Sequence, residues 1–228
     1  MSIKVQKVYQ IRFWLNKISP LICRRFLVNP KTTTIAGLHH LIQLAMNWEN
    51  FHLHQFTIQG KAYGISYAGG ICFGDDPYSI TLKDLQLREK ERLFYKYNFN
   101  IPWEIESRLE RLVPMNLKSF YPVCIAGNNI APSENYNHPI NFMVNQPTRF
   151  SNGMNYLISG LRKITKKRNI SANNIENKLI KISNWIDKYK LFNRKKLNSK
   201  LEQYAKSKLS LEDLEEDVYD DEEEVVLC

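Results

Sequence analysis

Few side chains in this sequence have the chemistry and spacing of a catalytic or metal-binding site. His52 and His54 lie two residues apart in an alternating segment, so both would face the same side of a strand. Two imidazoles at that spacing could share a metal ion with a third ligand such as Glu49. Without a cysteine or a further carboxylate at ligand spacing, a structural role at the edge of the core is the competing reading. We therefore predict no metal or other cofactor and keep the His52 and His54 pair as the alternative.

Other enzyme classes lack the residues that they need. Gly69 and Gly70 are followed by Ile71 and Cys72, where a phosphate-binding loop requires Lys and then Ser or Thr. Neither the N-terminal serine among arginines of a serine resolvase nor the Arg/His/Arg/Tyr set of a tyrosine recombinase is visible. The sequence therefore predicts a protein without enzymatic activity.

Cysteine usage and hydropathy indicate the compartment. The four cysteines occur singly, with no CxxC pair, at Cys23, Cys72, Cys124 and Cys228. There is no signal-like N-terminal segment, and no stretch of about 18 uncharged apolar residues occurs. We expect a cytoplasmic protein that does not contact membranes.

Charge is segregated along the chain. Of the 23 acidic residues, ten lie between positions 211 and 225, so thirteen remain elsewhere against 32 basic residues. Positions 161–208 alone hold fifteen basic and three acidic side chains. A body with this excess of positive charge attracts polyanions, and the attraction weakens as salt rises. The charge pattern therefore predicts DNA or RNA as a partner.

Clustered cations are the candidate phosphate contacts. They are Arg24 and Arg25 in the second strand, a first cluster at Arg162, Lys163, Lys166, Lys167 and Arg168, and a second at Arg194, Lys195 and Lys196. Trp185, Tyr189 and Phe192 lie near the second cluster. These aromatic rings could stack on bases, or they could anchor the helix that carries the cluster.

The hydrophobic pattern predicts the elements that would position these groups. Alternation indicates strands at residues 5–15, 22–28, 52–59, 62–66, 93–99 and 103–112. A helix over residues 35–48 is capped by Thr33 or Thr34, a short helix is expected at 82–87, and residues 121–147 read as irregular. Because strands and helices mix without regular βαβ spacing, we predict an α+β fold with a mixed or antiparallel sheet and one main packed helix.

The rest of the chain divides into an arm and a tail. We expect the α+β domain over residues 1–150, a basic helical arm over 151–208 and an acidic disordered tail over 209–228. Apolar residues of the arm step by four and three along one helical stripe, with Trp185 beside it: Ile175, Leu179, Ile182, Ile186 and Tyr189. That stripe either packs on its own domain or mediates dimerisation or partner docking.

Several ordered motifs carry a family resemblance. They include Ser19 to Arg25, Leu38-His39-His40-Leu41-Ile42, Asn47 to Phe56, Tyr95 to Phe99 and Tyr121 to Gly127. With these motifs the first 140 or so residues resemble the plasmid pRiA4b ORF-3-like family, which is also described as mobile-element passenger proteins. The resemblance covers about three fifths of the chain and supplies no mechanism.

The departures from that family pattern concern polar residues. The pattern has aspartates, a histidine and a cysteine pair where this chain has Asn98, Ile101 and Ile105 and the run 130–138. Asn, Ile and Ala neither ionise nor bind a metal strongly. The resemblance therefore implies that any ancestral site is lost here.

Together, charge and resemblance predict a non-catalytic accessory or adaptor protein of a nucleic-acid-handling machine, in a mobile-element or CRISPR-type defence locus. It would bind nucleic acid, a partner enzyme, or both through basic surfaces, and could form a homodimer. The alternatives are a metal-dependent nuclease or recombinase-like enzyme using the region of His52 and His54, and a protein-interaction module whose basic arm meets an acidic protein.

Overall fold

The computed structural model describes residues 5–67, 69–134, 136, 139–144, 155, 158–159, 162, 177, 180 and 192–207. Within them, the strands are β1 (Lys7–Leu15), β2 (Cys23–Val28), β3 (His54–Ile58), β4 (Lys61–Tyr63), β5 (Arg92–Tyr97), β6 (Trp103–Pro114) and β7 (Val123–Asn128). They form one sheet in the order β4-β3-β5-β6-β1-β2-β7. Neighbouring strands pair antiparallel throughout.

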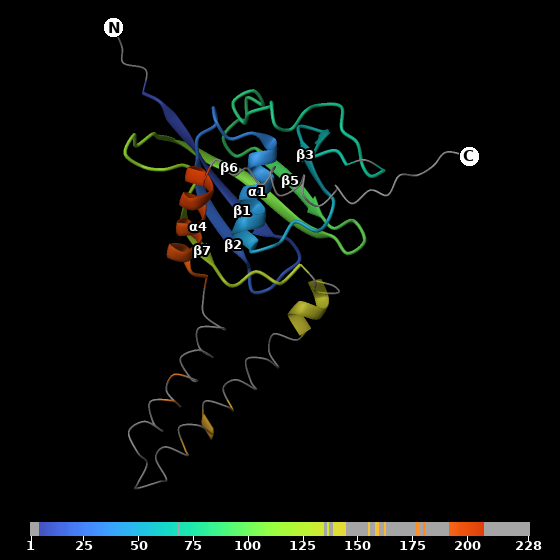
Figure 1. The fold of residues 1–228 in the computed structure, drawn as a ribbon, viewed down its shortest axis with the longest axis vertical. Coiled ribbons are helices and arrows are strands. Elements are labelled where there is room, and N and C mark those ends of the chain that lie inside the picture. Colours follow the sequence, from blue (N-terminus) through green and yellow to red (C-terminus); the bar gives the residue numbers. More distant parts are fainter. Residues whose placement is uncertain are drawn as a thin grey trace, which may run out of the picture.

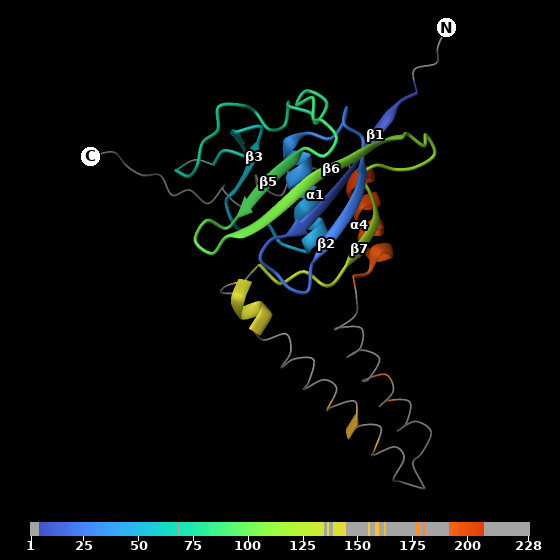
Figure 2. The ribbon, with the colours of Figure 1, turned by 180° about the vertical axis from the view of Figure 1, so that it is seen from behind.

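Two named helices accompany this sheet, and both lie on the same face of it (Figure 1). They are α1 (Ile35–Met46) and α4 (Arg194–Ser207). Viewed from behind, the opposite face of the strands carries no helix of the described residues (Figure 2). The sequence predicted an α+β fold with a mixed or antiparallel sheet, and the sheet of the described residues is antiparallel.

Most elements lie where the sequence pattern placed them. The side chain of Thr34 accepts a hydrogen bond from Gly37 N and caps α1, as predicted, and the helix ends at Asn47 in the left-handed region. Residues 82–86 form turns, so the short helix expected at 82–87 is absent there. The segment 121–147 was predicted to be irregular, but β7 lies inside it, because its partner β2 supplies the backbone hydrogen bonds.

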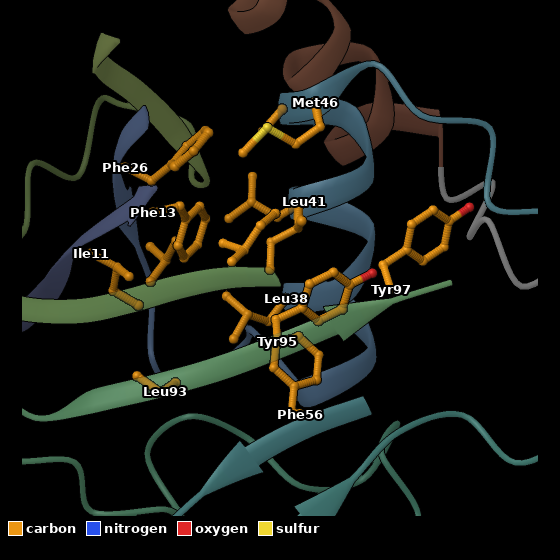
Figure 3. Close-up of a cluster of buried hydrophobic side chains, with 14 of the residues drawn as sticks. Ile11, Phe13, Phe26, Leu38, Leu41, Met46, Phe56, Leu93, Tyr95 and Tyr97 are labelled. Atoms are coloured by element: carbon orange, nitrogen blue, oxygen red, sulfur yellow. The ribbon is translucent and has the colours of Figure 1, made fainter. Parts of the chain in front are cut away.

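The core lies between α1 and the sheet (Figure 3). Leu38, Leu41 and Met46 of α1 meet Phe13 and Phe26 of the sheet, and all five are buried. Burying a side chain of this size stabilises the fold by about 1.5–3 kcal/mol relative to leaving it exposed. None of the described helices is long and apolar enough to cross a bilayer.

One stretch of this core is polar. The ring of His39 on α1 stacks on His54 of β3 with 3.6 Å between centroids, and both side chains are fully buried. His39 Nδ1 contacts the hydroxyl of Tyr95 at 2.9 Å, and that hydroxyl also accepts from Gln43 Nε2 at 2.8 Å. Burial, followed by the neighbouring His54 and His40 rings, lowers the pKa of His39 well below its ordinary range.

Stability should therefore depend on pH through His39. The unfolded chain takes up a proton on this side chain near pH 6.5, whereas the folded chain resists it, so stability is complete above about pH 6.5 and falls as pH decreases. We expect the urea midpoint to drop between about pH 7 and pH 5. His39→Gln should flatten that dependence. A midpoint with the same slope in both proteins would contradict the assignment.

Candidate functional site: a basic groove

Helix α4 lies against the edge of the sheet. Its Leu197 and Leu201 belong to the buried core. Asn198 accepts from Cys124 N at 2.8 Å and donates to Cys124 O at 2.9 Å, so its amide serves the free edge of β7 as a neighbouring strand would. The last part of the predicted arm is thus packed on the α+β domain. The predicted domain boundary at residue 150 stays a prediction.

Arg24 is the buried cation beside this helix. Only 2% of it is exposed. Its Nε donates to Ala45 O near the end of α1 at 3.2 Å, and its Nη1 donates to Cys23 O at 2.8 Å and to Asn128 O at 2.6 Å. Burial lowers the pKa of Arg24 to about 10, so it remains charged at neutral pH.

Phe192 covers the guanidinium of Arg24. The guanidinium carbon lies 3.9 Å from the centroid of the Phe192 ring, which is close cation–π contact. The ring fits because residue 127 is glycine: a Cβ at Gly127 would lie 2.4 Å from Phe192 Cε1 and 3.0 Å from Arg24 Cδ. Arg24 and Gly127 therefore fix where the chain enters α4.

A groove of about 1110 Å³ opens between the end of α1, residues 130–134 and the first half of α4. Five basic side chains line it, namely Arg24, Arg194, Lys195, Lys196 and Lys200, against two acidic ones, Glu49 and Glu134. Leu44, Met46 and Ile130 contribute apolar surface. The groove therefore has a cationic rim on a partly apolar floor.

Two of the rim cations are held in place by protein acceptors. Arg194 Nη1 donates to Ile125 O at 2.7 Å, and Lys200 Nζ donates to Asn47 Oδ1 at 2.8 Å. Each contact uses one of the five donors of a guanidinium or the three of an ammonium group. The remaining donors can serve an anionic ligand.

Glu134 holds the opposite wall of the groove. It is 4% exposed, its Oε1 accepts from Glu49 N at 2.6 Å, and its other oxygen accepts from the hydroxyl of Tyr97. Trp48 Nε1 also donates to the carbonyl oxygen of Pro132, two residues before Glu134, at 2.9 Å. Burial first, and then the bond to Glu134, raises the pKa of Tyr97. Both carboxylate oxygens are therefore engaged in fixing residues 132–134.

Sequence reasoning missed Glu134. It counted the run 130–138 as having lost its polar residues, and a single glutamate in a Pro- and Asn-rich stretch carries no periodic signal. Its partners come from β5 and from the residues after α1, so only the tertiary structure shows that it is buried.

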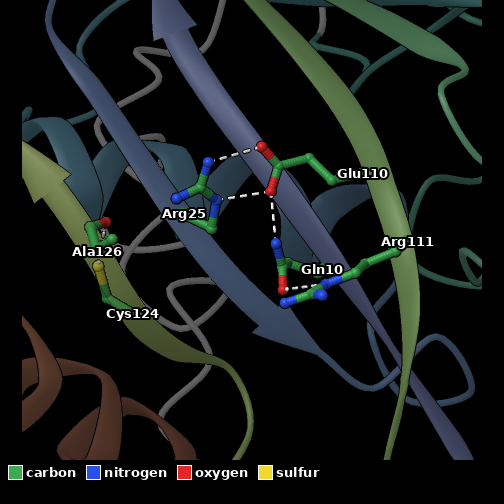
Figure 4. Close-up of polar contacts among 6 residues, drawn as sticks. All are labelled: Gln10, Arg25, Glu110, Arg111, Cys124 and Ala126. Carbon is green, nitrogen blue, oxygen red and sulfur yellow. Dashed lines mark hydrogen bonds and ion pairs between the residues drawn. The ribbon is translucent and has the colours of Figure 1, made fainter.

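The predicted phosphate contacts fall into different places. Arg194, Lys195 and Lys196 line the groove together. Arg24 also lines the groove, but it is only 2% exposed and its guanidinium donates to three carbonyls, so its predicted phosphate contact stays a prediction. Arg25 lies on the other face of the sheet and pairs with both oxygens of Glu110, at 2.6 and 2.8 Å (Figure 4).

The remaining predicted contacts cannot be placed in the same way. Arg162 is exposed in a helical position. Outside the described residues lie Lys163, Lys166, Lys167 and Arg168, and the whole predicted partner stripe of Ile175, Leu179, Ile182, Trp185, Ile186 and Tyr189.

The two histidines considered as metal ligands lie in different surroundings. His52 precedes β3 and packs edge-on against Tyr97, whereas His54 is fully buried and its Nε2 accepts from Ile65 N at 3.3 Å. Among the residues that the structure describes, no group of three or more His, Cys, Asp and Glu could hold a metal ion. Burial also raises the pKa of the Cys124 thiol to about 11, which disfavours the thiolate that a nucleophile requires.

The fold is an antiparallel sheet with helices on one face, and comparison with known proteins shows which family the chain belongs to. Residues 7–144 match the family model of plasmid pRiA4b ORF-3-like proteins, so the chain belongs to that family. Helix α4, which forms one wall of the groove, lies outside the matched residues.

Two relatives are themselves without an assigned function. One is the uncharacterized protein y4hQ of Sinorhizobium fredii, 29% identical over 114 residues that make up 48% of this chain and 57% of the relative. The chain thus spans little more than half the length of that relative. The other is the crystal structure of a protein of unknown function, MM3350 from Methanosarcina mazei Go1, with a TM-score of 0.52 and 23% identity over 78% of this chain and 89% of the other. That similarity shows the fold.

Removing the Glu134 carboxylate should destabilise the protein. Glu134→Ala leaves the Tyr97 hydroxyl and Glu49 N–H without their partner, at a cost of about 1–3 kcal/mol for each buried group left unsatisfied. Glu134→Gln keeps an acceptor for Glu49 N–H and should lose less. Urea unfolding measures both variants, and equal losses would contradict a role through hydrogen bonds.

Filling the space at Gly127 should loosen α4. The added methyl group of Gly127→Ala displaces the Phe192 ring from Arg24, so we expect faster hydrogen exchange at the amides of α4 with little change in those of α1. Gly74→Ala is the matched control, since a Cβ there meets nothing within 4 Å. Unchanged exchange in α4 would show that Phe192 does not anchor it.

Proposed function

We propose that this protein is a non-catalytic accessory protein that binds nucleic acid through phosphate contacts in the basic groove. The observation that carries the proposal is the convergence of Arg194, Lys195, Lys196 and Lys200 on one open concavity. Three of these four were candidate phosphate contacts from the sequence alone. Clustered cations on one face are the electrostatic feature expected of a nucleic-acid-binding surface.

The balance of charge in the groove favours an anion. Of its two acidic side chains, Glu134 turns both oxygens toward protein donors, which leaves Glu49 as the exposed carboxylate against four rim cations. Lysines bind phosphate as point charges and tolerate many backbone geometries. The groove is therefore suited to positioning a phosphate backbone, whereas base-specific reading would need a fixed set of donors and acceptors.

The buried polar groups are occupied by contacts with other protein groups, which supports an adaptor role. His39, His54, Tyr97 and Glu134 are all engaged in packing or in hydrogen bonds with other protein groups. The membership of a plasmid-related family supports a mobile-element setting. We propose that the protein presents nucleic acid to a partner enzyme in a mobile-element or defence locus, in the cytoplasm, with dimerisation through the arm as part of the same proposal.

Binding should depend on salt and on the groove lysines. We expect the full chain to bind a labelled DNA duplex or RNA hairpin in fluorescence anisotropy, with much weaker affinity at about 200 mM than at about 50 mM salt. Lys195→Ala combined with Lys196→Ala removes two contacts. It should lower the slope of log K against log salt by about 1.4–1.8, the value for two phosphates.

The control carries the same charge change elsewhere. Lys31→Ala combined with Lys83→Ala alters exposed lysines near the first turn of α1, about 18 Å along that helix from the groove. It should leave the slope almost unchanged. Equal effects of the two double variants would reduce the binding to net charge, and salt-insensitive binding would remove the nucleic-acid role. Cleavage of the probe with Mg²⁺ or Mn²⁺ present would favour the nuclease alternative.

A further inference from the structure

Four arginines form a row across the face of the sheet opposite α1 and α4. In the strand register, Arg92 of β5 is opposite Arg108 of β6, Arg108 is opposite Arg12 of β1, and Arg12 is opposite Arg25 of β2. These four strands are neighbours in the sheet. With about 4.8 Å between strands, the row extends for roughly 14 Å.

Such a row costs stability unless something compensates it. Like charges directly opposite each other on neighbouring strands repel. The outer arginines have partners: Arg92 pairs with Glu106 at 3.0 Å, and Arg25 pairs with Glu110 at 2.6 Å. Among the residues that the structure describes, Glu106 and Glu110 are the carboxylates that form ion pairs with this row.

The two inner arginines are less well compensated. Among the described residues, Arg12 and Arg108 form no ion pair within 4 Å, and the Nε of each is buried without a hydrogen-bond partner. Arg12 also lies 5.5 Å from the centroid of the Trp14 ring. Arg12 and Arg108 are therefore cross-strand neighbours whose charges are not neutralised by an ion pair with any described residue.

The surface around these arginines is hollowed and carries aromatic rings. A concavity of about 530 Å³ is lined by Arg12, Arg92, Arg108 and Lys90, with Trp14 at its side. In the adjacent row of the sheet, Trp14 and Phe94 flank Glu106 on either side. Phe94 is 48% exposed, which is high for a phenylalanine in the middle of a sheet.

We propose that this face of the sheet binds single-stranded nucleic acid. Phosphates would be held by Arg12 and Arg108, and neighbouring bases would stack on Trp14 and Phe94. A row of cations beside a row of aromatic side chains matches the two needs of single-stranded binding, since every base offers a π-face and every phosphate a charge. Paired bases cannot reach rings on a sheet surface, so a duplex gains only the charge contacts. The site lies on the other face of the sheet from the groove and does not rest on the groove's function.

Neutralising the inner arginines separates a binding role from a structural one. We expect Arg12→Gln combined with Arg108→Gln to weaken binding of a labelled oligothymidylate of about 12 nucleotides at least tenfold at about 50 mM salt, and to lower the salt slope by about 1.4. The thermal midpoint should stay the same or rise, because cross-strand repulsion is removed. Unchanged affinity would overturn the proposal, whatever happens to the thermal midpoint.

Further variants distinguish stacking from charge and this site from the groove. Phe94→Ser should weaken binding of the single strand but leave binding of a phosphopeptide of equal charge unaffected. If the unaltered protein binds that peptide as tightly as the single strand, the base-stacking assignment is overturned. Lys195→Ala with Lys196→Ala should leave the single-strand contacts at Arg12 and Arg108 in place. Loss of single-strand binding in this groove variant, without loss in the arginine variant, would overturn the sheet site while leaving the groove proposal standing.

Discussion

The burial of one positive charge, Arg24, determines how the parts of this protein fit together. A guanidinium removed from water needs several acceptors, and here they come from β2, from the end of β7 and from the end of α1, where the helix dipole is negative. Phe192 covers the remaining face. Because the same cation contacts three elements and the entry to α4, the groove wall cannot shift without exposing or unpairing a charge.

The sheet separates two positively charged surfaces of different chemistry. Successive side chains of a strand point to opposite faces, so Arg24 lies under the helices while Arg25 lies on the far side with Glu110. The helical side presents mainly lysines on a partly apolar groove, and the far side presents arginines beside aromatic rings. We propose that the first surface binds a phosphate backbone and that the second binds unstacked bases.

The buried polar groups of the domain serve its architecture. Glu134 binds residues 132–134 to the core through Tyr97 and Glu49, and His39 joins α1 to β5 through Tyr95. A general acid or a metal ligand needs a free lone pair or proton facing a ligand, whereas these groups face other protein atoms. The family and the solved relative share the fold, and the surface chemistry of this chain has to be argued from its own residues.

The sequence by itself determined the elements with local signals. Alternation predicted β1, β2, β3, β5 and β6, apolar spacing after a cap at Thr33 or Thr34 predicted α1, and the motifs predicted the family. The cation cluster at 194–196 was also visible, since its members are adjacent. Only the tertiary structure decided that Arg24 is buried, that 123–128 forms β7, that Glu134 reaches Tyr97, and that Arg12, Arg25, Arg92 and Arg108 form a row. Those outcomes depend on which strands pair and in what register, and that choice is made by contacts between residues far apart in the chain.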